Sequence, residues 1–257
     1  MTGRLDGKTA LVTGGSRGIG RAIGLRLAED GCAVVAFTYH SDAESAQNAA
    51  AAIEAAGATA VPIQARLEDP GEPAALFAAL DTELGRLTGR AGLDILVNNA
   101  GVPDHGTVTT TEPKAFDDVV AVNTRAPFFI IQAAAERLRD GGRVVNISSV
   151  YSTKPTAQAP VYSMAKAAVN ALTKVAAEEL GERGITVNAV APGWTATDAN
   201  ATARTGAGLV AQVARDTVAG RMAEPADVAG VVSLFASPEG AWLTGQYVDA
   251  NGRYRYS

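Results

Sequence analysis

The sequence predicts an α/β fold in which a single doubly wound parallel sheet of about seven strands carries helices on both faces. Short apolar runs alternate with longer segments whose apolar residues recur at helical spacing. The short runs are apolar throughout, which is typical of parallel strands that are buried on both faces. The 257 residues contain no linker, repeat or low-complexity block. We therefore expect one domain that covers residues 1–257.

The expected elements follow one another along the chain, and glycines mark several of their ends. The 18–30 helix stops at Gly31, the Ala-rich 41–56 helix at Gly57 and the 160–182 helix at Gly184. Further helices are expected at residues 73–87 and 113–139, the latter bent by Pro127. Strands are predicted at residues 8–13, 33–38, 60–64, 93–97, 143–147, 185–190 and 247–249.

Residues 195–220 are rich in Ala, Thr and Gly and look the least ordered part of the chain. They follow the end of a predicted strand, where substrate loops of open α/β sheets usually lie. We expect a substrate loop or lid over about 194–220.

Composition excludes several classes of protein. The formal net charge is −5 and no basic run stands out, so nucleic-acid binding is not expected. No apolar run approaches the length of a membrane span, and nothing near Met1 resembles a signal peptide. Cys32 is the single cysteine and lies in an apolar run, which predicts a buried thiol in a cytoplasmic protein. His40 and His105 are far apart and have no partner cysteines, so no metal site is expected.

A glycine-rich segment, Thr-Gly-Gly-Ser-Arg-Gly-Ile-Gly over residues 13–20, follows the first strand and opens a helix. This is the context of a dinucleotide site. Gly14 permits a tight turn, Gly18 lets a pyrophosphate approach the backbone, and Gly20 allows close helix packing. The helix amino terminus then faces the phosphates. A glycine-rich turn without a ligand is the alternative.

Tyr162 and Lys166 are four residues apart in a segment that reads as helix, so both side chains lie on one helical face. A nearby cation stabilises a phenolate and lowers the pKa of a tyrosine. Such a tyrosine can donate or accept a proton near neutral pH. The pair by itself also fits two unrelated surface residues.

Together, five motifs over nearly the whole chain resemble those of the short-chain dehydrogenase/reductase family. They are the 13–20 loop, Asn-Asn-Ala-Gly at residues 98–101, Ser149 with the Tyr162 and Lys166 pair, the helix residue Asn123, and Pro192-Gly193. The chain looks most similar to 3-oxoacyl-[acyl-carrier-protein] reductases and to ketoreductases that tailor polyketides. The resemblance implies a Rossmann-type fold and an oxidoreductase that transfers hydride between a nicotinamide cofactor and a ketone.

The resemblance also implies a role for each residue of a catalytic tetrad. Tyr162 would donate a proton to the ketone oxygen, and Lys166 would lower the pKa of Tyr162 and hold the nicotinamide ribose. Ser149 would polarise the carbonyl, and Ser148 is its alternative, a strand-end hydroxyl without a chemical role. Asn123 would anchor a water that connects Lys166 to solvent, or else be an amide bonded to helix backbone.

The sequence favours NADPH/NADP+ over NAD. No acid occupies the tip of the 33–38 strand, where a carboxylate would hold the ribose hydroxyls of NAD. Arg17 can pair with a 2′-phosphate, and His40 and Ser41 are expected beside it. Asp42 is expected to cap the next helix. Arg66 replaces the adenine-contacting Asp of the family and is expected to stack on adenine or to reach Glu68.

The complete predicted sites extend this set. The predicted cofactor site contains Gly14, Ser16, Arg17, Gly18, Ile19, Gly20, Tyr39, His40, Ser41, Leu67, Asn99, Ala100, Gly101, Tyr162, Lys166, Pro192, Gly193, Thr195 and Thr197. The predicted substrate pocket contains Val150, Tyr151, Thr153, Gln158 and Trp194. Trp194 offers a flat apolar wall for a ring, or is simply a packed side chain.

Three functions stay open at this stage. The first is reduction of a cyclic or aromatic polyketide-type ketone, and the second is reduction of a 3-oxoacyl thioester on a carrier protein. Of two basic positions that would meet an acidic carrier beside the cleft, one is Asp140 here and the other is Arg183, so a carrier partner is disfavoured. The third is a non-catalytic NADPH-binding regulatory protein.

The resemblance further implies a homotetramer built on the 113–139 and 160–182 helices and the last strand. For the aromatic and basic tail at residues 251–257, both packing at a subunit interface and fraying stay open.

Overall fold

The sheet of this computed structural model, which describes residues 4–89, 91–104, 106–205 and 207–254, is parallel throughout. Among the described residues its strands are β1 (Thr9–Val12), β2 (Val34–Tyr39), β3 (Thr59–Gln64), β4 (Leu93–Asn98), β5 (Leu138–Ile147), β6 (Thr186–Pro192) and β7 (Tyr247–Ala250). Their order is β3-β2-β1-β4-β5-β6-β7. The order reverses between β1 and β4, and a crevice forms at such a switch point, beyond the carboxyl ends of the strands.

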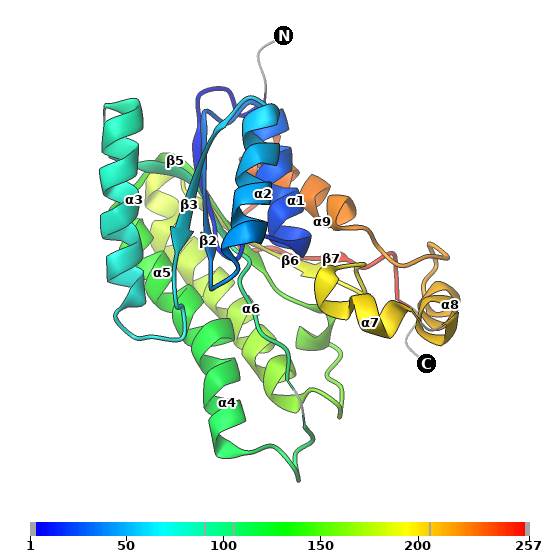
Figure 1. Cartoon of the computed structure of the whole chain (residues 1–257). Coiled ribbons are helices and arrows are strands. Elements are labelled where there is room, and N and C mark those ends of the chain that lie inside the picture. The colour runs from blue at the N-terminus through cyan, green and yellow to red at the C-terminus, as the bar shows by residue number, and fades with distance from the viewer. Residues whose placement is uncertain (1–3, 90, 105, 206, 255–257) are drawn as a thin grey trace.

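Helices cover both faces of the sheet (Figure 1). They are α1 (Gly18–Glu29), α2 (Ala43–Ala55), α3 (Glu72–Thr88), α4 (Pro113–Val120), α5 (Ala126–Ala135), α6 (Pro160–Leu180), α7 (Ala201–Arg204), α8 (Ala207–Asp216) and α9 (Pro225–Ala236). One core joins α1, α2 and α9 to the sheet and contains the buried Cys32, as predicted. A second core joins α3, α5 and α6 to the opposite face. The predicted doubly wound fold is confirmed.

The prediction of one long helix over residues 113–139 is wrong. The segment consists of α4, a π-helical turn at Ala121–Arg125 and α5, while Leu138 already belongs to β5. Pro127 has no amide hydrogen, so the carbonyl of Asn123 cannot make the usual helical hydrogen bond. A π turn widens the helix at this point, and such turns often occur at functional sites. The turn contains Asn123.

The 194–220 segment is helical, contrary to the irregular loop that its composition suggested. It contains a short 3-10 turn at Asp198–Asn200 followed by α7 and α8. The Arg204 guanidinium donates to the carbonyl of Thr197 over 3.1 Å and to Asn200 Oδ1 over 2.9 Å, which anchors the start of the segment. These side-chain contacts stabilise short helices whose sequence pattern is weak.

The described part of the C-terminal tail pairs with the other end of this segment. The amide of Val218 donates to the carbonyl of Arg253, and that of Ala219 to Gly252, each over 3.0 Å. Residues 255–257 of the tail and His105 lie outside the described residues. Among the described helices, none is long and apolar enough to cross a membrane.

Candidate active site

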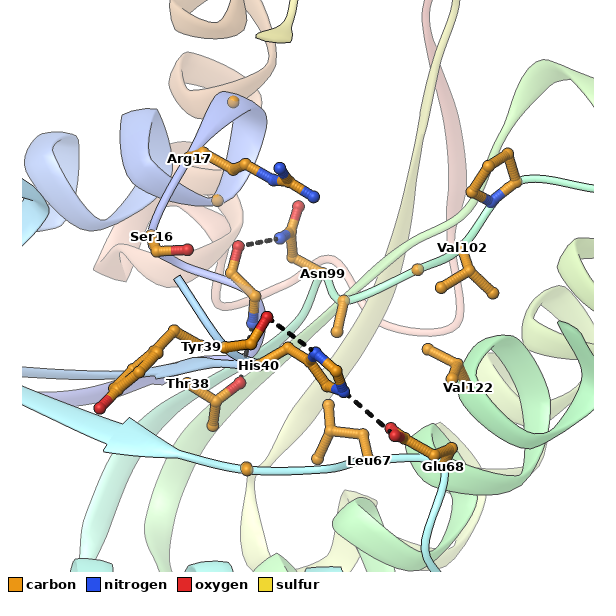
Figure 2. A pocket seen from close by; sticks show the side chains of 18 of the residues that line it. Ser16, Arg17, Thr38, Tyr39, His40, Leu67, Glu68, Asn99, Val102 and Val122 are labelled. Carbon is orange, nitrogen blue, oxygen red and sulfur yellow. Dashed lines mark hydrogen bonds and ion pairs between the residues drawn. The ribbon is translucent and has the colours of Figure 1, made fainter. Parts of the chain in front are cut away.

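A cleft of about 860 Å³ lies at the carboxyl edge of the sheet, where the strand order reverses. Most of the predicted cofactor residues line it: Gly14, Ser16, Arg17, Gly18, Ile19, Gly20, Tyr39, His40, Ser41, Leu67, Asn99, Ala100, Gly101 and Thr197. Figure 2 shows Arg17 and Asn99 on one side of this space and Leu67 and Val122 on another. The topology therefore gathers residues from six separate parts of the sequence around one cavity.

Three positions of the glycine-rich turn require glycine. Gly14 has φ +65° and Gly18 has φ +54°, a backbone region that side chains disfavour. A Cβ on Gly20 would lie 2.1 Å from the carbonyl oxygen of Gly14. The backbone of the turn therefore approaches the start of α1 closely, and the amino end of α1 opens into the cleft, as in an anion site.

Hydrogen bonds between β1 and β4 hold this turn in place. The Thr13 hydroxyl accepts the amides of Asn99 over 2.9 Å and Ala100 over 3.0 Å. The Asn99 side-chain amide donates to the carbonyls of Thr13 over 2.9 Å and Gly14 over 3.0 Å. The turn and the Asn-Asn-Ala-Gly segment thus form one rigid wall of the cleft.

At the opposite end of the cleft, His40 points toward Glu68 (Figure 2), and its Nδ1 lies 3.3 Å from the Ser41 hydroxyl. His40 Nε2 is 3.1 Å from Glu68 Oε1, and Arg66 Nη2 is also 3.1 Å from that oxygen. Burial opposes the ionisation of Glu68, but hydrogen bonds from its own backbone amide and from His40, with the charges of His40 and Arg66, lower its pKa. The predicted contact between Arg66 and Glu68 is confirmed.

Asp42 caps α2, as predicted. Its carboxylate accepts the backbone amide of Ser45 over 2.9 Å and the Ser45 hydroxyl over 2.7 Å. These hydrogen bonds, ahead of the charge of Arg17, lower the pKa of Asp42.

The predicted tetrad residues converge behind the wall formed by residues 99–101. The Ser149 hydroxyl hydrogen-bonds the Tyr162 hydroxyl. Lys166 Nζ donates to the carbonyl of Ile147 over 2.8 Å and lies 5.5 Å from the centre of the Tyr162 ring. The hydroxyl of Ser149, two residues after β5, therefore meets the hydroxyl of Tyr162 on α6.

The prediction that Lys166 lowers the pKa of Tyr162 is wrong. Burial raises the pKa of Tyr162 to about 12, although the hydrogen bond from Ser149 lowers it, and the charge of Tyr151 adds to the rise. Burial also lowers the pKa of Lys166 to about 8. Loss of water around the phenolate is the largest cause, so Tyr162 stays protonated in neutral solution.

Asn123 connects the tetrad to the cleft. Its side-chain amide donates to the carbonyls of Val102 over 3.0 Å and Val119 over 2.9 Å, so the backbone-bonded alternative describes this group correctly. Its Oδ1 is buried and has no partner among the described residues. A Cβ on Gly101 would lie 2.8 Å from that Oδ1 and 3.6 Å from Lys166 Nζ. Because Gly101 has no side chain, only its backbone lies between the cleft and these two tetrad residues.

Ser148 is part of a structural network. Its hydroxyl donates to Asn170 Oδ1 over 2.6 Å, and the Asn170 amide donates to the Ser152 hydroxyl over 2.9 Å. The Ser152 hydroxyl in turn donates to the carbonyl of Ser149 over 2.6 Å. This chain ties α6 to the backbone of Ser149, whose own hydroxyl is left to face Tyr162.

Two of the predicted substrate residues meet. The Trp194 indole hydrogen-bonds the Tyr151 hydroxyl, and Trp194 is only half-buried. Gln158 and Thr153 are exposed, whereas Val150 is buried in the short turn that follows Ser149.

Tyr247 was not expected at the site. Its hydroxyl donates to Asp249 Oδ1 over 2.9 Å and lies 3.3 Å from Thr153 Oγ1 and 3.5 Å from the carbonyl oxygen of Ser149. Only the pairing of β7 with β6 brings Tyr247 here. No local sequence signal could have identified it.

Five of the predicted cofactor residues are not part of the cleft lining: Tyr162, Lys166, Pro192, Gly193 and Thr195. Thr195 is buried and donates to the carbonyl of Gly193 over 3.1 Å. Gly193 is held close to Asn251, because a Cβ there would lie 2.9 Å from the Asn251 Cβ. Residues 192–195 form the turn that precedes Thr197, and Thr197 lies beside Gly18.

The expectation that Asp140 and Arg183 lie beside the cleft is wrong within one subunit. Asp140 lies near the start of β5 and Arg183 precedes β6, so both are at the amino edge of the sheet, opposite to Ser149. Arg183 Nε donates to Asp140 Oδ1 over 2.9 Å. The remaining cation is therefore paired with a carboxylate.

Within the described ranges, no group of three His, Cys, Asp or Glu side chains could hold a metal ion.

Substitution of Lys166 by Met should change how stability depends on pH. Because the folded-state pKa of Lys166 is about 8 against an ordinary value of 10.5, the unfolded chain binds more protons between these pH values. The free energy of unfolding of the wild type should therefore rise with pH in this window, by ~3 kcal/mol relative to that of Lys166→Met. Urea unfolding of both proteins from pH 7 to 10.5 measures this; a difference that stays constant would contradict it.

Known proteins are similar in sequence to this chain over almost its full length. A family model described as enoyl-(acyl carrier protein) reductase matches residues 14–254. An uncharacterized oxidoreductase of Methylorubrum extorquens is 39% identical over 257 residues, which cover 98% of this chain and 99% of the relative. A 3-oxoacyl-[acyl-carrier-protein] reductase of Staphylococcus aureus is 37% identical over 247 residues, covering 95% of this chain and 97% of that protein.

Solved structures are also similar to this chain over almost its full length. The angucycline C-6 ketoreductase LanV with bound NADP superposes with a TM-score of 0.93 at 41% identity, covering 98% of this chain and 97% of LanV. The parallel sheet, the glycine turn and the match to the family model agree, and the chain is an oxidoreductase that belongs to the short-chain dehydrogenase/reductase family.

Proposed function

We propose that this protein is an NADPH-dependent ketoreductase that reduces a cyclic or aromatic polyketide-type ketone to a secondary alcohol. The observation that carries the proposal is the hydrogen-bonded pair of Ser149 and Tyr162 hydroxyls. Tyr162 lies on the same helix as Lys166, whose ammonium group is close to Gly101 of the cleft. A carbonyl oxygen placed between these hydroxyls would meet two donors at once.

The chain offers a fitting site for NADPH, which supplies the hydride when bound. The cradle formed by Gly14, Gly18 and the amino end of α1 suits a pyrophosphate, because side chains there would fill the space. Arg17, His40 and Ser41 would hold the 2′-phosphate. The backbone of Leu67, at the same end of the cleft, would contact adenine.

Each tetrad residue then has a task that matches its surroundings. Ser149 donates to the ketone oxygen and polarises it. Tyr162, kept protonated by burial, gives its proton to the developing alkoxide. Lys166 holds its ammonium group beside the Tyr162 ring and next to Gly101. The unpaired Oδ1 of Asn123 accepts a hydrogen bond from a water that restores the proton.

The substrate side favours a ring ketone. Trp194 and Tyr151 are hydrogen-bonded to each other and present flat aromatic surfaces, which suit a planar ring system. LanV, a C-6 ketoreductase of an angucycline, supports this substrate class. We propose that residues 194–220 form the substrate lid, since Thr197 and Asp198 line the cleft.

The second candidate function is reduction of a 3-oxoacyl thioester on an acyl carrier protein. The Staphylococcus aureus relative favours it. Against it, the two positions expected to meet a carrier, Asp140 and Arg183, are paired with each other at the amino edge of the sheet and do not lie beside the cleft of the same subunit. A regulatory protein that only binds NADPH would not require the full tetrad.

A panel of ketones with NADPH, assayed on wild type and Tyr162→Phe, tests the proposal. We expect turnover of bicyclic and aromatic polyketide-type ketones, and a loss of at least ~10²-fold in kcat for Tyr162→Phe because the proton donor is gone. NADPH binding, followed by nicotinamide fluorescence, should persist in the variant.

The other outcomes separate the candidates. Turnover of a 3-oxoacyl thioester on a carrier protein, without turnover of ring ketones, would select the second function. NADPH binding without any turnover would select the regulatory protein. Unchanged turnover by Tyr162→Phe would refute the assigned mechanism.

Cofactor preference is tested by Arg17→Ala. Because Arg17 lines the cleft and can pair with a 2′-phosphate, its loss should lower the ratio of kcat/KM for NADPH to that for NADH by ~10-fold or more. Arg21 is exposed on the same helix outside the cleft lining, so Arg21→Ala is the matched control. A ratio that changes equally in both variants would refute the role of Arg17.

We also propose a homotetramer, the state that the resemblance implies. Support comes from apolar side chains that are exposed on α4, α5 and α6, namely Phe116, Phe128, Phe129, Met164 and Val175, and from Trp242 before β7, which is 97% exposed. Isolated chains rarely expose such patches. Mass photometry should give about four times the 26.2 kDa chain mass; a monomer peak would rule the tetramer out.

A further inference from the structure

The helix that carries Tyr162 and Lys166 has no cap of its own. Ala159 precedes α6 and has no side-chain acceptor, and Pro160 at the first helical position has no amide hydrogen. The amides of Val161 and Tyr162 lie too early in the helix to bond within it. Buried amides of this kind need an acceptor from elsewhere in the chain.

Asp104 provides that acceptor. Its Oδ2 accepts the amide of Val161 over 2.8 Å and the amide of Tyr162 over 3.3 Å, across a separation of 57 residues from Val161. The next amide, that of Ser163, already bonds to the carbonyl of Ala159 over 3.0 Å. One side chain from a distant loop therefore completes the amino end of α6.

The cost of burying this carboxylate shows that its position is specific. Asp104 is 7% exposed, and its Oδ1 is buried without a hydrogen-bond partner among the described residues. A buried carboxylate with an unpaired oxygen is unfavourable unless other interactions offset it. The positive end of the α6 macrodipole and two amide donors supply that offset.

The loop that carries Asp104 also touches the rest of the site. Val102 and Pro103, which precede Asp104, line the cleft. The carbonyl of Val102 accepts the side-chain amide of Asn123 over 3.0 Å. A single short loop thus contacts the cofactor cleft, Asn123 and the backbone of Tyr162.

We propose that Asp104 is a positioning residue of the reaction, which sets the Tyr162 hydroxyl relative to the cleft by capping α6 from the cleft-lining loop. The inference rests on the proposed reductase function. Hydroxyl placement matters because a small displacement of a reacting group lowers the rate strongly while binding is unaffected.

Two substitutions test the role, each assayed with the best ketone of the panel. Asp104→Ala removes the acceptor, and we expect kcat to fall at least ~10-fold with the Kd for NADPH within ~3-fold of wild type. Asp104→Asn keeps an amide oxygen that accepts the same two hydrogen bonds, so its kcat should stay within ~3-fold of wild type. Asp140→Ala, at the far edge of the sheet, is the control and should match wild type.

Each other result overturns the inference. A kcat for Asp104→Ala close to wild type shows that the cap is dispensable. Equal losses in both Asp104 variants show that the contact acts by charge and not by accepting the amides. Loss of NADPH binding along with kcat in Asp104→Ala shows a general structural role. If Asp104→Ala does not fold, Asp104→Asn alone decides, since its loss of kcat overturns the proposal and its retention supports it.

Tyr162→Phe, run in parallel, separates this inference from the proposed function. An active Tyr162→Phe refutes the reductase mechanism itself. An inactive Tyr162→Phe beside a fully active Asp104→Ala refutes only the positioning role.

Discussion

The hydrogen bonds between Thr13 and Asn99 are the contact on which the whole site depends. They join the loop after β1 to the loop after β4, at the point where the strand order reverses. One threonine hydroxyl and one asparagine amide satisfy the backbone groups that two ending strands leave free. The phosphate turn and the wall formed by residues 99–101 thereby become one rigid unit. The positions of both the cleft and the tetrad follow from it.

Behind that wall, the site is built from polar groups that the fold buries at a cost. Lys166 and Tyr162 are both deprived of water, and their pKa values move in directions that disfavour charge. The carbonyl of Ile147 at the end of β5 accepts a hydrogen bond from the Lys166 ammonium group, and the Ser149 hydroxyl hydrogen-bonds the Tyr162 hydroxyl. A water-poor site strengthens these interactions, and in the proposed reaction they would act on the carbonyl of the substrate.

The π turn at Asn123 and the cap at Asp104 meet the same loop from two sides. Asn123 reaches the carbonyl of Val102 because the turn widens the helix before Pro127. Asp104, two residues after Val102, reaches the amides of α6. Two helical segments that are separate in the sequence thus make hydrogen bonds to the same short loop. Such convergence explains how residues on α6 and on the helix before it can face the same reaction site.

The sequence by itself determined the strands, most of the helices and the glycine turn, because apolar runs, helical spacing and glycine positions are local signals. It also identified the tetrad by motif, as well as the cap at Asp42 and the contact of Arg66 with Glu68, which join near neighbours. Only the tertiary structure decided the raised pKa of Tyr162, the division of the 113–139 segment, the helical 194–220 segment, and the arrival of Tyr247 and Asp104 at the site. Each of these depends on burial or on contacts between segments far apart in the chain, and neither is encoded in a local pattern.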